Sequence, residues 1–140
     1  MLTADGAFLL AVMGQHTFNA GKIYFPCGTP DPNDLVGDKV DLDRSVRREL
    51  KEETGLDVTS FETEAGWNMV VDGRLIALIK VLRSTENATS LRESVLAHLA
   101  REKRPELADI RIVRGPGDID PTVPSFVTAF LASRFARGKV

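Results

Sequence analysis

The sequence predicts a single α/β domain of the α+β type, spanning residues 1–140, in which helices pack on the faces of a mixed β-sheet. Strand-like and helix-like segments interleave along the chain without the regular spacing of repeated βαβ units. A length of 140 residues fits one domain, and a hydrophobic content of 43% is enough for one core.

Composition and charge exclude several classes of protein. The net charge of −2 gives no basic field for nucleic acid or an anionic membrane, so we expect neither as a partner. No apolar run approaches the roughly 20 residues that span a bilayer, and Met1–Asp5 lack the basic start of a signal peptide. Cys27 is the only cysteine, which suits a reducing compartment. We therefore expect a cytoplasmic protein.

The chain begins with two predicted strands and a loop. Ala7–Gly14 is an apolar run ended by glycine, which is typical of a buried strand. Lys22–Phe25 follows as a second short strand. Prolines and a glycine disfavour regular structure over Pro26–Asp34, and we expect the loop to continue to Asp41.

A charged helix follows this loop. Asp41 or Asp43 can cap its amino-terminal end, because a short carboxylate accepts hydrogen bonds from the first free backbone N–H groups. The helix is predicted to end near Glu53 or Thr54. Gly55 then stands where a left-handed C-terminal cap is needed.

The second half of the chain predicts a hairpin, two helices and a strand. Asp72-Gly73 is a strong turn signal between apolar segments, so Trp67–Leu82 is predicted to form a β-hairpin. Ser90–Glu93 has capping-box spacing and would open a helix that runs to about Lys103. The remaining predicted elements are a strand over Asp109–Val113, a loop over Gly115–Pro121 and a helix over Ser125–Phe135.

The acids of the charged helix are not placed as on a solvated helix face. At about 100° per residue, with Glu49 set at zero, Glu53 falls near 40° and Glu52 near −60°. The apolar stripe lies on the same side, and the basic residues lie opposite it. The stripe consists of Leu42, Val46 and Leu50, and the basic face consists of Arg44, Arg47 and Lys51.

Two interpretations of these acids compete. The first is a surface helix supported by i,i+4 pairs such as Arg48–Glu52. The second is a metal site, because core-facing carboxylates need a partner and Arg48 alone cannot neutralise three of them. Ligands that are all oxygen favour Mg²⁺, with Mn²⁺ as a substitute. An ion of this kind polarises phosphoryl oxygens, so the implied chemistry is hydrolysis at phosphorus.

The segment Arg48–Leu56, RELKEETGL, resembles the second half of the Nudix hydrolase signature at every specified position. That half reads Arg-Glu, an aliphatic residue, any residue, Glu-Glu, any residue, Gly and an aliphatic residue. The resemblance implies the α/β/α sandwich of that family, with a mixed sheet, over the whole chain.

The first half of the signature departs from the family pattern. Val40 stands where the spacing back from Arg48 requires a glutamate. An insertion of about six residues within Gly28–Asp41 accounts for the difference. Gly28 would then be the signature glycine, and Asp34, or alternatively Asp38, would replace the first glutamate.

The resemblance also implies roles for individual residues. Glu52 and Glu53 would be the main Mg²⁺ ligands, and Glu49 would complete the site or orient the attacking water. Arg48 would hold a glutamate in place through a charge-assisted hydrogen bond. Gly28 would offer its carbonyl oxygen near the metal.

Several residues outside the helix are candidates for further roles. In the family a further acid from a distant loop often acts as the base, and here Glu93, Asp118 and Asp120 remain open. The two aspartates also suit plain turn roles. Trp67 and Tyr24 can either stack on a base or pack in the core.

The resemblance implies a Mg²⁺-dependent hydrolase that cleaves the pyrophosphate bond of a nucleoside diphosphate linked to another group, X. The alternative is a Nudix-fold module that binds a nucleotide and has lost catalysis. The inserted segment Gly28–Asp41 is expected to border the pocket. The resemblance also allows a homodimer.

Overall fold

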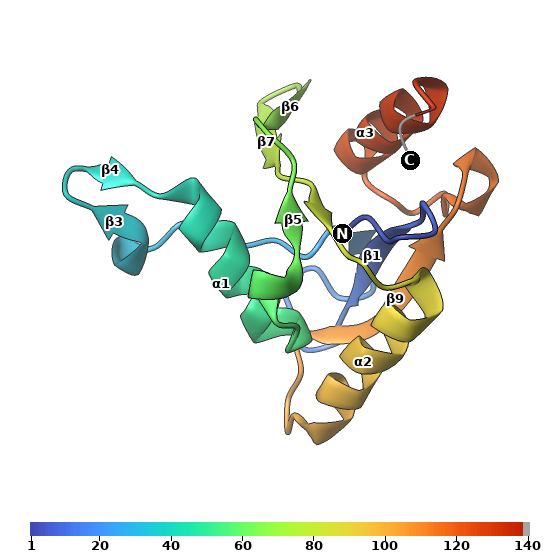
Figure 1. Ribbon diagram of the computed structural model, residues 1–140, viewed down its shortest axis with the longest axis horizontal. Coiled ribbons are helices and arrows are strands. Elements are labelled where there is room, and N and C mark those ends of the chain that lie inside the picture. Colours follow the sequence, from blue (N-terminus) through green and yellow to red (C-terminus); the bar gives the residue numbers. More distant parts are fainter. Residues whose placement is uncertain (139–140) are drawn as a thin grey trace.

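The computed structural model describes residues 1–138, and at its centre lies a three-stranded antiparallel sheet in the order β2-β1-β9 (Figure 1). Phe8 of β1 pairs with Val113 of β9, and Ala11 of β1 pairs with Tyr24 of β2. β1 is buried almost throughout, which explains its uninterrupted apolar sequence. These strands span Phe8–Met13 (β1), Ile23–Tyr24 (β2) and Leu107–Val113 (β9).

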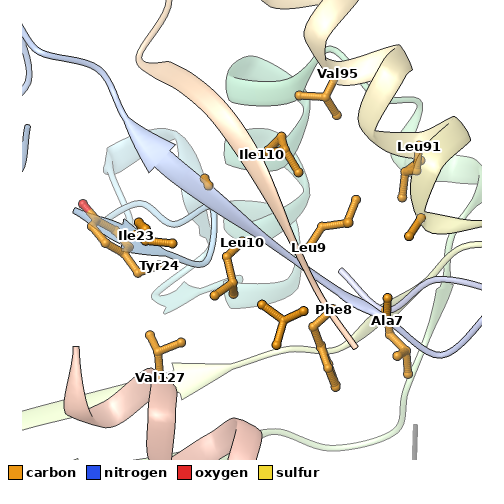
Figure 2. Close-up of a cluster of buried hydrophobic side chains, with 14 of the residues drawn as sticks. Ala7, Phe8, Leu9, Leu10, Ile23, Tyr24, Leu91, Val95, Ile110 and Val127 are labelled. Carbon is orange, nitrogen blue, oxygen red and sulfur yellow. The ribbon is translucent and has the colours of Figure 1, made fainter. Parts of the chain in front are cut away.

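Helices cover both faces of this sheet. Leu9 of β1 lies on the side of Leu91 of α2, whereas Phe8 lies on the other side (Figure 2). The Phe8 ring packs edge-on against Phe130 of α3, with ring centroids 5.7 Å apart. The buried apolar residues form one cluster around the sheet. The helices span Leu42–Thr54 (α1), Ala88–Arg101 (α2) and Ser125–Ala136 (α3).

Short strand pairs surround the central sheet. All of them are antiparallel, and one isolated bridge between Leu2 and Arg83 is the parallel contact seen within residues 1–138. The α+β class is confirmed. Every pair of named strands is antiparallel, and in the part of the chain that the structure describes, the parallel pairing that a mixed sheet requires is limited to the bridge between Leu2 and Arg83. The pairs are Leu35–Val36 (β3) with Lys39–Val40 (β4), Glu62–Thr63 (β5) with Leu82–Arg83 (β8), and Asn68–Asp72 (β6) with Leu75–Ile79 (β7).

The charged helix α1 begins and ends as predicted. The Asp41 side chain accepts a hydrogen bond of 3.0 Å from the backbone N–H of Arg44. Gly55 has a φ of 69°, and its N–H donates to the Lys51 carbonyl at 2.8 Å. A side chain at Gly55 would be strained in this left-handed conformation and would also collide with His98 of α2.

Three local predictions need correction. The predicted loop up to Asp41 contains the 3₁₀ turn Pro32–Asp34 (η1) and the β3–β4 hairpin. Helix α2 is capped by Asn87, which accepts from the Ser90 N–H, so Ser90 is inside the helix rather than at its cap. The β6–β7 turn is Gly73-Arg74, because Asp72 pairs with Leu75 as the last strand residue.

The β6–β7 hairpin has an unusually apolar exposed face. Met69 and Val71 on β6 are 65% and 62% exposed. Their cross-strand partners on β7, Leu78 and Ile76, are 46% and 62% exposed. Contiguous exposed apolar side chains often mark a site of contact with a ligand or partner. No helix within residues 1–138 is long and apolar enough to cross a membrane.

Candidate active site

The three glutamates of α1 do not all point in the same direction. Glu53 is buried, with 6% of its surface exposed, and the Glu49 side chain is 19% exposed. The helical angles predicted that both side chains lie on the core-facing side, and their burial confirms this. Glu52 differs, because its side chain is 60% exposed and turns towards Arg48. The expectation of three inward acids is therefore wrong for Glu52, which lies at the edge of the apolar stripe.

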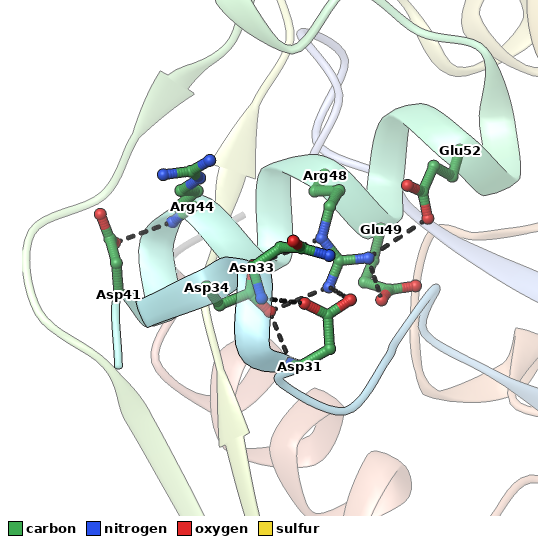
Figure 3. A network of polar contacts seen from close by, with 8 residues as sticks. All are labelled: Asp31, Asn33, Asp34, Asp41, Arg44, Arg48, Glu49 and Glu52. Carbon is green, nitrogen blue, oxygen red and sulfur yellow. Dashed lines mark hydrogen bonds and ion pairs between the residues drawn. The ribbon is translucent and has the colours of Figure 1, made fainter. Parts of the chain in front are cut away.

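Arg48 joins α1 to the loop before it (Figure 3). Its Nη2 lies 2.9 Å from Asp34 Oδ2, and its Nε donates to Asp34 Oδ1 at 3.3 Å. Its Nη1 lies 2.8 Å from Glu49 Oε1 and 3.3 Å from Glu52 Oε2. A two-pronged contact with Asp34 uses the planar fork of the guanidinium and fixes the loop against the helix.

Asp34 is the loop carboxylate that contacts Arg48. It is fully buried, and it also accepts a hydrogen bond of 2.9 Å from the backbone N–H of Asp31. The hydrogen bonds from Arg48 and from that backbone hold the pKa of Asp34 down at about 2. Asp38, the other candidate, is exposed in the β3–β4 turn. The segment before α1 thus brings Asp34 back to Arg48, although the two residues are fourteen positions apart.

Glu53 has an unsatisfied carboxylate oxygen. Its Oε2 is buried without a hydrogen-bond partner among residues 1–138, and the backbone N–H of Cys27 donates to the carboxylate. Burial first, and then the nearby charges of Glu106 and Glu49, raise the pKa of Glu53 to about 8. A buried carboxylate with a free oxygen and acidic neighbours is the kind of group that a cation would stabilise.

Gly28 lies directly against Glu49. A Cβ atom added at Gly28 would lie 2.6 Å from Glu49 Oε1 and closer still to the carbons of the same side chain. Only glycine allows the main chain to approach this closely. The segment after β2 therefore runs along the inner side of α1, with Cys27 at Glu53 and Gly28 at Glu49.

Glu106 is an acid of this site that sequence reasoning missed. It precedes β9, and its charge raises the pKa values of Glu49, Glu53 and Tyr24. Its backbone carbonyl accepts a hydrogen bond of 2.7 Å from Gly14 at the end of β1. Figure 1 shows the start of β9 near the carboxyl-terminal end of α1. The pairing of β9 with β1 creates this proximity, and no spacing along the chain indicates it.

The predicted distant acids lie elsewhere. Glu93 is exposed on α2. Asp118 accepts from the Arg114 backbone N–H at 2.7 Å, and Asp120 accepts from Thr122 N at 2.8 Å, so both aspartates stabilise local turns. The loop that holds them lies across the molecule from α1 (Figure 1). Their turn roles are those that their sequence context favoured.

An apolar cavity of about 470 Å³ adjoins the acidic cluster. Gly28 and Glu49 line it, together with residues of β7 and α3. Trp67 and Tyr24, the two candidates for base stacking, both line it. The Glu49 carboxylate and a space large enough for a small ligand are therefore contiguous.

The donor atoms of the cluster are of the kind that a hard divalent cation prefers. Within residues 1–138, no three His, Cys, Asp or Glu side chains are close enough to form a metal-binding group. Arg48 holds Glu49 and Glu52, whereas Glu53 keeps a free oxygen. Carboxylates beside a main-chain segment provide only oxygen donors, which Mg²⁺ prefers.

Comparison of the chain with models of known protein families and with curated proteins found no match. The assignment of this site therefore depends on the geometry of its own residues.

Proposed function

We propose that the protein is a Mg²⁺-dependent hydrolase of the Nudix type, which cleaves the pyrophosphate bond of a nucleoside diphosphate linked to a group X. One observation carries this proposal. Glu53 is buried with a free carboxylate oxygen, and Glu49 and Glu106 add negative charge around it. A protein core tolerates this crowding when a cation joins it or when a proton neutralises it.

Three further features support a Nudix-type arrangement. Helices cover both faces of the central sheet, as a Nudix α/β/α sandwich requires. Arg48 binds Asp34, the residue proposed to replace the first glutamate of the signature. Gly28, the proposed signature glycine, contacts Glu49, so the two halves of the interrupted signature meet in space.

Each residue of the site would have a separate role. Glu49, Glu53 and the Gly28 carbonyl would hold Mg²⁺, with Glu52 available once it leaves Arg48. The bound ion supplies Lewis acidity that offsets charge on the phosphoryl oxygens. Arg48 orients Glu49 through its contact of 2.8 Å.

Glu106 is exposed beside Glu53 and would accept a proton from the attacking water on its carboxylate. The water oxygen bonds to one phosphorus, and the bridging P–O bond breaks. Two phosphomonoester products leave, one carrying the nucleoside and the other carrying X.

The test is a Mg²⁺-supplemented screen across nucleoside diphosphate derivatives, in which phosphate is detected after a phosphatase treats the products. Wild-type protein should turn over at least one derivative. Glu53→Gln and Glu49→Gln should lower kcat by at least about 10²-fold. Glu93→Gln, an exposed change on α2, is the matched control and should retain activity. Full activity in Glu53→Gln would refute the proposal.

The non-catalytic binding module remains a second candidate, and one observation favours it. Arg48 already contacts Glu49 and Glu52, so these two carboxylates have a partner without an ion. A module of this kind would bind a nucleotide without Mg²⁺-dependent turnover. Binding without hydrolysis across the whole screen would select it.

A further inference from the structure

The cavity beside Glu49 indicates the chemical class of X. We infer that X is an aliphatic chain and that this chain occupies the cavity, while the diphosphate lies at the carboxylates. The inference rests on the proposed function, which places the diphosphate at the cavity edge formed by Gly28 and Glu49.

One wall of the cavity is the free edge of the hairpin. Every residue of β7 lines the cavity, whereas no residue of β6 does, and these two strands form a sheet of their own. Leu75 on one face of the hairpin, and Ile76 and Leu78 on the other, border the cavity at this edge, and they are 46%, 62% and 46% exposed. An aliphatic ligand that covered them would remove this apolar surface from water.

The opposite walls are also apolar. Phe126 and Phe130 of α3 face the cavity, and Leu42, Val46 and Leu50 of α1 complete it. The cavity therefore has one carboxylate, that of Glu49, on a lining that is otherwise mostly apolar. A molecule with a charged diphosphate and an aliphatic chain matches this lining.

Three of the polar side chains along the cavity already have partners. Ser45 donates to Asp34, and Tyr24 is hydrogen-bonded to Asn19. Lys80 Nζ donates to the Gly66 carbonyl at 2.8 Å. A sugar placed here would lose its hydration and find few free side-chain partners, which is costly. A sugar that bonded to the main chain of the β7 edge is the competing occupant, and the test below separates the two.

Trp67 provides a direct signal for occupancy of the cavity. It is the only tryptophan of the chain and lines the cavity. Lys80 Nζ lies 5.2 Å from the centroid of its ring and holds it at the wall. The fluorescence of this one residue therefore reports a ligand in the cavity without any need for hydrolysis.

The experiment compares two non-hydrolysable ligands that differ only in X. Both are esters of α,β-methylene-ADP, one with a ten-carbon alkyl chain and one with glucose. Titrations monitored by Trp67 fluorescence in the presence of Mg²⁺ should give a Kd at least about tenfold lower for the alkyl ester. Equal affinities, or tighter binding of the glucose ester, would overturn the inference.

Two matched double variants test whether the alkyl chain of the ligand lies against the cavity wall. Ile76→Thr/Leu78→Thr removes apolar surface from the cavity wall and should weaken binding of the alkyl ester about tenfold, with little effect on the glucose ester. Met69→Thr/Val71→Thr changes the cross-strand partners, which do not line the cavity, and should leave both affinities within about twofold. Equal weakening by the two double variants would overturn the inference.

This test is separable from that of the proposed function. Mg²⁺-dependent turnover of polar derivatives, unchanged in Ile76→Thr/Leu78→Thr and without preference for the alkyl ester, would leave the hydrolase standing and refute the aliphatic X. Selective binding of the alkyl ester without turnover of any hydrolysable derivative would support the aliphatic ligand and contradict the hydrolase.

Discussion

Gly28 and Glu49 are in such close contact that no side chain fits at position 28, since even a Cβ atom would lie 2.6 Å from Glu49 Oε1. This contact joins the segment after β2 to the inner face of α1. It also brings a main-chain segment beside two core-facing carboxylates, those of Glu49 and Glu53.

Gly28→Ala should therefore disturb both stability and activity. The added methyl group must displace the Glu49 side chain, and overpacking of this kind costs about 1–3 kcal/mol of unfolding free energy. Chemical denaturation measures this loss, and kcat should fall because Glu49 moves. Gly115→Ala is the control, because nothing lies within 4 Å of its added Cβ atom and its φ is extended. If the two alanine variants were equally stable and active, the close contact would be wrong.

The raised pKa of Glu53 predicts how the free energy of unfolding of the metal-free protein depends on pH. Burial raises its pKa to about 8, whereas an unfolded glutamate titrates near about 4.3. Between these values the folded state binds more protons than the unfolded state, so the free energy of unfolding falls as pH rises towards 8.

Glu53→Gln removes this titration. In the presence of a chelator, the Tm of the variant relative to wild type should rise steadily between about pH 5 and pH 9. Saturating Mg²⁺ should raise the Tm of wild type at the high end of this range, because the ion replaces the proton. A Tm difference that stays constant across the range would contradict a buried, strained carboxylate.

The contact between Asp34 and Arg48 is predicted to stabilise the packing of the segment before α1 against that helix. Asp34→Asn removes the charge that Arg48 binds in a buried position and should cost roughly 1.5–3 kcal/mol of unfolding free energy. Asp38→Asn changes an exposed carboxylate four residues later and should stay within about 0.5 kcal/mol of wild type. Denaturant titrations measure the free energy of unfolding of the two variants. Equal values would contradict a stabilising contact between Asp34 and Arg48.

Glu106 is predicted to be the acid that accepts the proton from water. Glu106→Gln should lower kcat by about 10²-fold or more, because general-base catalysis contributes at least that much. Glu93→Gln and Asp118→Asn, which lie on α2 and in a turn, should have near wild-type kcat. Steady-state kinetics on one substrate test all three. An effect confined to Glu93 or Asp118 would show that the base comes from another loop.

Sequence reasoning was most successful where the physics is local. The caps of α1 at Asp41 and Gly55 follow from backbone groups within one turn, and the inward positions of Glu49 and Glu53 follow from helical periodicity. The i,i+4 pair of Arg48 and Glu52, predicted by the surface-helix interpretation, is confirmed, and it turns Glu52 outward from the other two acids.

The remaining features depend on contacts between distant segments. Glu106 reaches the site only through the pairing of β9 with β1, which no local pattern encodes. The position of the segment before α1 likewise depends on the contact between Asp34 and Arg48. The apolar cavity depends on how β7 and α3 approach α1, so its lining could not be predicted residue by residue.

The most direct test of the metal site is an anomalous-difference map from crystals soaked in Mn²⁺. Our account predicts one strong peak about 2 Å from a carboxylate oxygen of Glu53, with Glu49 also in coordination. The peak should be absent in crystals of Glu53→Gln and present in those of Glu93→Gln. A map with no peak near Glu53, in crystals where its carboxylate stays buried, would contradict the account.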